Sequence, residues 1–328
     1  MDLILLLEQA IQELPKGDHS TGLNAIVRHV KAAIRHYERD KAVDPDACTD
    51  AIYRTNQAYE GSLKEAYRVL AGKDPAKVSP FDIESYLEGN GTVRPRVLTK
   101  FTRYRQDYRN PSTHDYKLDF DHDEALLAII AVCGFANLLV HQIKSKINSA
   151  AAQVRVSRNA DNDFLNSLKN TDFPEAVARI CFSYTQESAG VDWFEYEKGV
   201  SESIKSYGIE SKLFLLEEND DDTNDANLWD VTATNGKVSV GIDSRIYRGD
   251  KSSSGAISLR YRINMHSLDT AGAAIVIIRS YHPKEYSIYR INNQVREAYV
   301  IFPEEDQEQL DLLQSEFGDF EQLSISEK

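Results

Sequence analysis

The stretch that decides the fold of the first half of the chain is Tyr108-Arg109-Asn110-Pro111-Ser112-Thr113-His114-Asp115-Tyr116. A segment with apolar residues at helical spacing leads into it, and a strongly apolar segment, residues 125–140, follows it. Pro111 is expected to end the first helix, because its ring and its missing N–H cannot continue the helical hydrogen bonds. Asp121, with Glu124 three residues later, is typical of a capping box that begins the second helix. The stretch therefore predicts a helix–turn–helix with a cation and an imidazole at its turn.

The remaining residues of the first half are also predicted to be helical. Apolar residues recur at helical spacing in four further segments, residues 2–14, 22–39, 50–71 and 80–87. Pro95 is typical of the first position of the helix that leads into the opening stretch. Helices joined by short connections pack as a bundle, so we expect an all-helical domain over residues 1–150.

The second half, residues 151–328, carries both helical and strand signals. Helices are predicted at residues 163–169, 174–187, 193–206 and 306–317. Strands are predicted at residues 213–216, 228–234, 237–247, 256–263, 274–278 and 298–302. A small and polar segment, residues 148–163, is the expected boundary between the halves. The second domain is therefore expected to be α+β, or α/β with a mixed sheet.

One hairpin is predicted around Asn235-Gly236, a pair that favours a two-residue type I′ turn. With that turn, Asp230 would lie opposite Gly241 and would have Asp243 as its diagonal neighbour on the same face. Trp229 would lie on the other, apolar face, because side chains alternate along a strand. The hairpin is therefore expected to be buried on one side and polar on the other.

The charge of the chain is uneven. The 328 residues carry a net charge of −14. Residues 1–150 hold 20 Lys+Arg and 21 Asp+Glu, whereas residues 151–328 hold 18 and 31. The first half is therefore nearly neutral and would not repel a polyanion. Within it, residues 94–109 form a local basic stripe. The cations of that stripe ahead of Arg109 are Arg94, Arg96, Lys100, Arg103 and Arg105.

Composition indicates a soluble, cytoplasmic protein of about two domains. Mean hydropathy is −0.47, and we expect no apolar run to be long enough to span a bilayer. The short apolar run at residues 3–7 has no basic flank, so we expect an amphipathic helix there instead of a signal peptide. The three cysteines have no metal-ligand spacing, which indicates reduced, structural thiols.

The motif resembles the signature of the HEPN superfamily, in which an Arg, a polar residue, a short gap and a His lie near the last helices of an all-α bundle. Arg109, Asn110 and His114 carry that pattern here. The segment at residues 58–67 is similar to an earlier helix of that fold, and residues 114–127 are similar to its passage from motif to helix. The resemblance covers about residues 20–148, and it does not extend to the second half.

The resemblance implies a metal-independent endoribonuclease, active as a homodimer in which two motifs meet. His114 would exchange a proton with the ribose 2′-OH or the departing 5′-oxygen, and Arg109 would hold the phosphoryl oxygens. Asn110 would orient the imidazole or bind a phosphate oxygen, and the product would carry a 2′,3′-cyclic phosphate. The basic stripe would bind the RNA backbone, and Tyr104, Tyr108 or Tyr116 would stack on a base. Glu60 and Tyr116 are candidates for supporting roles at the site.

By analogy with proteins of this kind, the expected setting is phage defence, abortive infection or a toxin system. The acidic second domain would then sense or restrain the nuclease through a regulatory ligand or protein. The alternative is a non-catalytic HEPN-like module, in which the bundle serves dimerisation and the acidic domain docks a partner. The two hypotheses differ in whether Arg109 and His114 line an open basic groove or lie against carboxylates.

Two further patterns lie in the second half. Asp230 and Asp243, followed by Arg245, resemble the carboxylate pair and basic residue of restriction-endonuclease-like folds, which bind a divalent metal. An Arg replaces the usual Lys there, and a polar solvent face explains the same pattern, so we expect no metal or other cofactor. The acidic loop at residues 217–227 would either mimic nucleic acid and inhibit the site or be a solvated loop. No phosphate-binding glycine loop and no serine-hydrolase motif occurs in the sequence.

Overall fold

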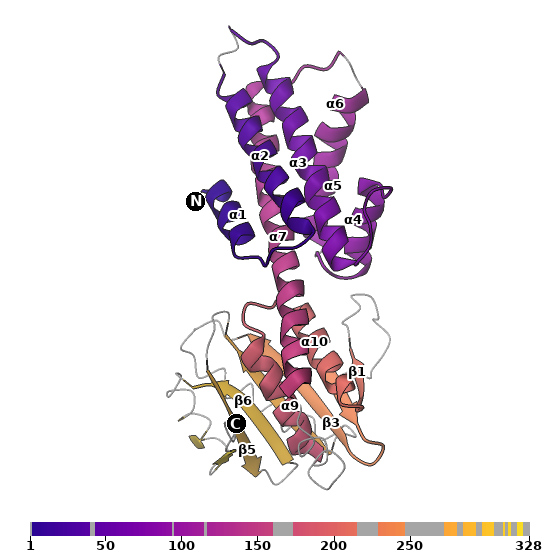
Figure 1. The fold of residues 1–328 in the computed structure, drawn as a ribbon, viewed down its shortest axis with the longest axis vertical. Coiled ribbons are helices and arrows are strands. Elements are labelled where there is room, and N and C mark those ends of the chain that lie inside the picture. The colour runs from indigo at the N-terminus through magenta and orange to yellow at the C-terminus, as the bar shows by residue number, and fades with distance from the viewer. Residues whose placement is uncertain are drawn as a thin grey trace. The chain divides into compact units, whose positions relative to one another are not determined.

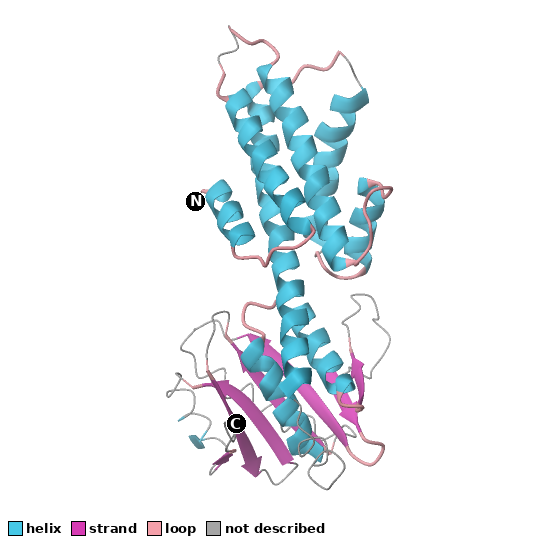
Figure 2. Cartoon of the chain, viewed as in Figure 1, coloured by secondary structure: helices cyan, strands magenta, loops and turns pink. Residues whose placement is uncertain are grey.

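The computed structural model describes most of the chain: residues 2–39, 43–93, 95–114, 117–159, 173–214, 229–246, 272–280, 285–292, 297–304, 311, 314–315 and 320–323. The chain divides into two compact units, Met1–Ile147 and Asn148–Lys328. The described residues of the first unit form helices only, whereas those of the second combine helices with a seven-stranded sheet (Figures 1 and 2). The expected layout of an α part followed by an α+β part is therefore confirmed.

The first unit is a helical bundle around one apolar core. Its elements are α1 (Leu3–Gln12), α2 (His19–Tyr37), α3 (Ala47–Leu70), α4 (Pro80–Gly89), α5 (Pro95–Tyr104), the π-helical turn η1 (Arg105–Arg109), α6 (Asn110–His114) and the part of α7 (His122–Asn159) that runs up to Ile147. The core draws apolar side chains from α1 to α5 and from α7. The capping box is present: Glu124 Oε2 accepts from the Asp121 N–H at 2.9 Å, and Asp121 Oδ1 accepts from the Glu124 N–H at 2.8 Å.

Pro111 does not end its helix, contrary to the expectation from sequence. The elements α5, η1 and α6 follow one another without a break from Pro95 to His114. In η1, the N–H of Asn110 donates to the carbonyl of Arg105, five residues earlier. This widened turn lies directly before Pro111, at a point where the usual spacing of four residues is already lost. The turn predicted between Arg109 and His114 is therefore helical, and the chain leaves the helix only after His114.

Helix α7 also differs from the expectation. It was expected to end near residue 148 but continues to Asn159, through most of the segment at residues 148–163 that we expected to be the domain boundary. Residues 148–159 contain no Gly or Pro and include three consecutive alanines, which favour a helix. By length and composition alone, α7 could cross a membrane, and half of its most apolar stretch is buried in the protein. Residues 160–172, with the predicted helix at 163–169, lie outside the described residues.

The second unit is built on a mixed sheet. Helices α9 (Phe173–Glu187) and α10 (Trp193–Ser206) precede strands β1 (Glu210–Leu213), β2 (Val231–Thr234), β3 (Ser239–Ile246), β4 (Ala273–Arg279), β5 (Tyr286–Asn292), β6 (Glu297–Pro303) and β7 (Phe320–Gln322). The strand order is β1-β2-β3-β4-β6-β5-β7, and the β3–β4 and β4–β6 pairs are parallel. Both helices pack on one face of the sheet (Figure 1). The sequence did not predict β5 and β7, and the predicted strand at 256–263 lies outside the described residues.

The β2–β3 hairpin has a different register from the predicted one. Thr232, not Asp230, lies opposite Gly241. The loop is longer than two residues because Asn235 Oδ1 accepts from the N–H groups of residues 237 and 238, at 3.0 and 2.9 Å. Asp230 is thereby brought opposite Asp243. The ring of Trp229 lies against Gly241, where a Cβ atom would meet it at 2.1 Å, so Trp229 packs on the face opposite to the expected one.

Candidate active site

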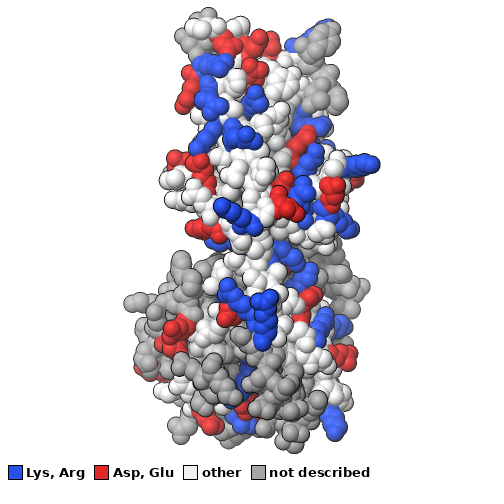
Figure 3. Space-filling view, viewed as in Figure 1, with Lys and Arg blue, Asp and Glu red and all other residues white. Residues whose placement is uncertain are grey.

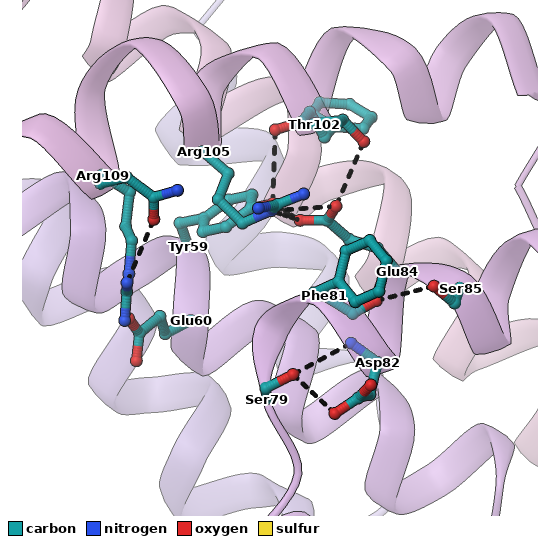
Figure 4. Close-up of polar contacts among 12 residues, drawn as sticks. Tyr59, Glu60, Ser79, Phe81, Asp82, Glu84, Ser85, Thr102, Arg105 and Arg109 are labelled. Carbon is teal, nitrogen blue, oxygen red and sulfur yellow. Dashed lines mark hydrogen bonds and ion pairs between the residues drawn. The ribbon is translucent and has the colours of Figure 1, made fainter.

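Arg109 is the residue of the motif whose contacts define the site. It ends the widened turn η1, and Asn110 begins α6. Arg109 Nη2 lies 2.7 Å from Glu60 Oε1, and Nε donates to the same oxygen at 2.8 Å. Arg109 Nη1 donates to Asn110 Oδ1 at 3.2 Å. Figure 4 shows Arg109 and Glu60 turned toward each other. Two predicted catalytic residues and one predicted supporting residue therefore lie together.

The motif segment is also held at Ser112. Asn56 Nδ2 donates to Ser112 Oγ at 2.6 Å, and the Tyr53 hydroxyl donates to the Ser112 carbonyl at 3.0 Å. Ser112 Oγ donates in turn to the Arg109 carbonyl at 3.0 Å. Tyr53, Asn56 and Glu60 are spaced by three and four residues, so they lie along one face of α3. We call these three residues the α3 clamp. It fixes the segment from Arg109 to Ser112 against a long, rigid helix.

The buried Tyr104 contacts the clamp through its hydroxyl. Its hydroxyl lies 2.8 Å from both Asn56 Oδ1 and Thr55 Oγ1. Burial raises the pKa of Tyr104, so its hydroxyl keeps its proton and stays a donor. Since the Asn56 oxygen receives this hydrogen bond, its NH2 group is the one that faces Ser112. The sequence offered no signal for this network, because its partners lie far apart in the chain.

His114 is the last residue of α6, four residues and about one helical turn after Asn110. Its side chain lies outside the described part of the structure, as do the whole of Arg94 and Tyr116. The structure therefore places the backbone that carries His114, and its catalytic role remains a prediction.

The fold exposes some cations of the predicted basic stripe and buries another. Arg96, Lys100 and Arg103 are exposed on α5, spaced by four and three residues. Arg105, by contrast, is mostly buried, and its Nε lies 2.9 Å from Glu84 Oε1. We therefore assign Arg105 a structural role. Figure 3 shows cations and carboxylates interspersed on the visible face of the first unit, with no single basic field.

Glu84 is the residue of this pair that sequence reasoning missed. It is buried on α4, and it accepts hydrogen bonds from Arg105, from Thr102 Oγ1 at 3.2 Å and from the Tyr59 hydroxyl. Burial, followed by the charge of Glu84, raises the pKa of Tyr59, which stays protonated as a donor. Figure 4 shows Arg105 and Arg109 pointing to two different carboxylates. The network ties α4 to the helix that leads into the motif.

In the second unit, three carboxylates gather beside β3. The backbone N–H of Ser244 donates to Asp230 Oδ2 at 2.6 Å, and its hydroxyl donates to Glu197 Oε1 at 3.1 Å. Asp243 is buried and accepts from Arg245 Nε at 3.3 Å. Burial and the neighbouring Asp230 raise the pKa of Glu197 to about 8, and burial and Asp243 raise the pKa of Asp230 to about 6. Glu197 therefore keeps its proton near neutral pH, whereas Asp230 takes one up at mildly acidic pH.

The two carboxylates predicted as an alternative metal pair, Asp230 and Asp243, thus lie close together. Glu197, which sequence reasoning missed, joins them from α10, a helix distant in sequence from β3. Within the described ranges, however, no group of three or more His, Cys, Asp or Glu side chains is arranged to hold a metal ion. The cluster is satisfied by hydrogen bonds and protons, so we derive no metal chemistry from it.

Comparisons with protein-family models, with curated proteins and with solved structures found no match. The resemblance to the HEPN superfamily therefore rests on the motif and its helical setting.

Proposed function

We propose that the first unit is a metal-independent endoribonuclease whose catalytic residues are Arg109, Asn110 and His114. One observation carries the proposal: Glu60, from a different helix, holds the Arg109 guanidinium beside Asn110, one turn before His114. A catalytic group needs such support, because an arginine in a flexible position would lose orientation at the reacting phosphate. The widened turn η1 at this point also fits, since such turns often occur at functional sites.

The proposed reaction is an attack of the ribose 2′-oxygen on the adjacent phosphorus. His114 takes the proton of the 2′-OH, the bond from phosphorus to the 5′-oxygen breaks, and the imidazolium formed on His114 returns the proton to that oxygen. Arg109 stabilises the charge on the non-bridging oxygens, because its planar fork matches a phosphoryl group and never loses its charge. Asn110 orients the imidazole or binds a phosphate oxygen. The product carries a 2′,3′-cyclic phosphate, and no cofactor takes part.

The partners belong to the same proposal. RNA would bind along Arg96, Lys100 and Arg103, and the enzyme would act as a cytoplasmic homodimer in which two motifs meet. By family analogy it would serve phage defence, abortive infection or a toxin system. The second unit would sense or restrain the nuclease. The acidic loop at residues 217–227 lies outside the described residues.

A test of the chemistry is cleavage of a labelled single-stranded RNA that contains one 2′-deoxynucleotide. The deoxy position removes the attacking oxygen, so cutting after it should stop while cutting elsewhere continues. The products should carry cyclic phosphates. A second test mixes the Arg109→Ala and His114→Ala proteins. If the site combines Arg109 of one chain with His114 of another, the mixture regains activity that neither variant has alone.

One observation favours the alternative of a non-catalytic dimerisation or binding module. Arg109 already lies against a carboxylate, and its side chain is only about one quarter exposed. Under that alternative, the Arg109–Glu60 pair links two helices and takes no part in catalysis. The wild-type chain would then cut no RNA, while Glu60→Ala would still weaken the bundle.

A further inference from the structure

Of the tyrosines that the sequence offered for base stacking, the two that the structure describes do not present an open ring. Tyr104 is buried, and Tyr108 packs between the rings of Tyr104 and Phe120, with centroid distances of 5.5 and 6.2 Å. Tyr116 lies outside the described residues. A base can stack only on a ring face that is open to solvent, so Tyr104 cannot serve and Tyr108 is poorly placed.

Tyr53 is an aromatic residue that is exposed to solvent and contacts the motif segment. The residue is 45% exposed, although it belongs to α3, the helix that carries the clamp. Its hydroxyl donates to the Ser112 carbonyl at 3.0 Å, within the segment that runs from Arg109 to His114. Tyr53 is therefore accessible to solvent while its hydroxyl is fixed to the motif segment. An aromatic ring so held loses little entropy when a flat ligand stacks on it.

Two exposed arginines belong to α2 and α3. Arg54 follows Tyr53 and is exposed, as is Arg28 on α2. Burial, followed by the charges of Arg54 and Arg28, lowers the pKa of His29 on α2. Proteins bind single-stranded nucleic acid with cations that meet the backbone and with aromatic rings on which the bases stack, so these arginines add positive charge to α2 and to α3, the helix that carries the clamp.

We propose that Tyr53 is the stacking position for an unpaired base next to the cleaved phosphate, and that the substrate is therefore single-stranded RNA or a loop. The inference rests on the proposed function, because it takes Arg109 to His114 as the place of cleavage. In a duplex, each base is covered by its neighbours and cannot offer a face to Tyr53. A single strand can offer it without unpairing. Tyr53 thus adds a binding residue and a substrate class to the site.

The experiment measures stacking separately from cutting. The full-length His114→Ala protein serves as the background, so that RNA is bound and not cleaved. The probe is a single-stranded oligoribonucleotide in which each position in turn is the fluorescent base 2-aminopurine. Tyr53→Phe keeps the ring and loses the hydrogen bond to Ser112, whereas Tyr53→Leu removes the ring. Trp193→Leu, which removes an equally exposed aromatic residue of the second unit, is the control.

We expect fluorescence at one probe position to be quenched by the background protein and by its Tyr53→Phe form. Tyr53→Leu should abolish the quench and weaken binding about tenfold to hundredfold, as removal of a stacking ring does. Trp193→Leu should change neither, and a duplex of the same sequence should show no quench. An unchanged quench and affinity in Tyr53→Leu would overturn the inference while the nuclease proposal stands. Absence of RNA binding by every protein, with no cleavage by the wild type, would overturn both.

Discussion

Arg109 and Glu60 form a two-contact ion pair across the bundle, with Nη2 and Nε of the arginine at 2.7 and 2.8 Å from the same carboxylate oxygen. The pair joins the end of the widened turn, where the motif begins, to the middle of α3. It leaves the guanidinium partly exposed, next to the Asn110 side chain. Glu60 is therefore the group that orients Arg109.

Glu60→Ala should lower the rate of RNA cleavage about tenfold to hundredfold, because the Arg109 fork loses the group that orients it. The stability of the first unit should change by no more than about 1 kcal/mol, since a partly exposed ion pair contributes little. Single-turnover cleavage and urea unfolding measure the two effects. Glu8→Ala, which breaks the similarly exposed pair with Lys31 at 2.5 Å, is the control and should cut at the wild-type rate. Equal rates for Glu60→Ala and wild type would remove Glu60 from the site.

Ser112→Ala should destabilise the first unit by about 1–3 kcal/mol, because the buried Asn56 amide then lacks its acceptor. Ser112→Thr keeps a hydroxyl and should recover part of the loss. Urea unfolding followed by far-ultraviolet circular dichroism measures the change. Ser85→Ala removes an exposed hydroxyl on α4 and should stay within about 0.5 kcal/mol of the wild type. A neutral Ser112→Ala would show that the clamp does not hold α6.

Glu84→Ala should destabilise the first unit by about 3–5 kcal/mol, because it leaves the mostly buried Arg105 without its partner. Replacing both residues, as Glu84→Leu with Arg105→Met, should recover much of that loss, since no charge then remains buried. Thermal unfolding reports both changes, and Glu88→Ala, at an exposed position of the same helix, is the control. If the double variant were as unstable as Glu84→Ala, the loss would arise from packing and not from the unpaired charge.

The stability of the second unit should fall as the pH rises from about 4 to 8. The folded-state pKa of Glu197 is raised to about 8 and that of Asp230 to about 6, above their unfolded values of about 4. The folded state therefore binds more protons, and its stabilisation is lost as the pH rises through the folded pKa values. Each group contributes a slope of at most about 1.4 kcal/mol per pH unit.

Tryptophan fluorescence is suited to this measurement, because both tryptophans of the chain, Trp193 and Trp229, lie in the second unit. Urea unfolding at pH 5 and pH 8 should show lower stability at pH 8. Glu197→Gln should flatten the dependence, whereas Glu202→Gln, at an exposed position of α10, should not. A stability that rises from pH 5 to pH 8 would show that the cluster does not hold its protons.

The sequence predicted those parts of the fold that local interactions decide. The capping box at Asp121 and the helix that begins at Pro80 formed as expected, because their hydrogen bonds link residues three apart. The prediction that the helix ends at Pro111 was wrong. The widened turn that precedes Pro111 can be recognised only from the hydrogen bond of Asn110 to Arg105. The hairpin register failed for a similar reason, since the Asn235 side chain lengthened the loop.

The candidate site was predictable only as far as its motif. Arg109, Asn110 and His114 are close in sequence, so their proximity follows from the chain itself. The partners that hold them come from far away: Glu60 is 49 residues from Arg109, and Asn56 is 56 residues from Ser112. Glu84 and Glu197 were missed because nothing in their local sequence distinguishes a buried, hydrogen-bonded carboxylate from an exposed one.

The most direct measurement is single-turnover cleavage of labelled single-stranded RNA in EDTA by full-length wild type, His114→Ala and Arg109→Ala. Arg68→Ala, which removes an arginine that pairs with Glu65 elsewhere on α3, is the control. We predict EDTA-resistant cutting by the wild type and the control, reduced at least about a hundredfold in the two motif variants. Cutting that persists in both motif variants, or a wild type that cuts no RNA, would contradict the assignment of Arg109 and His114 as catalytic residues.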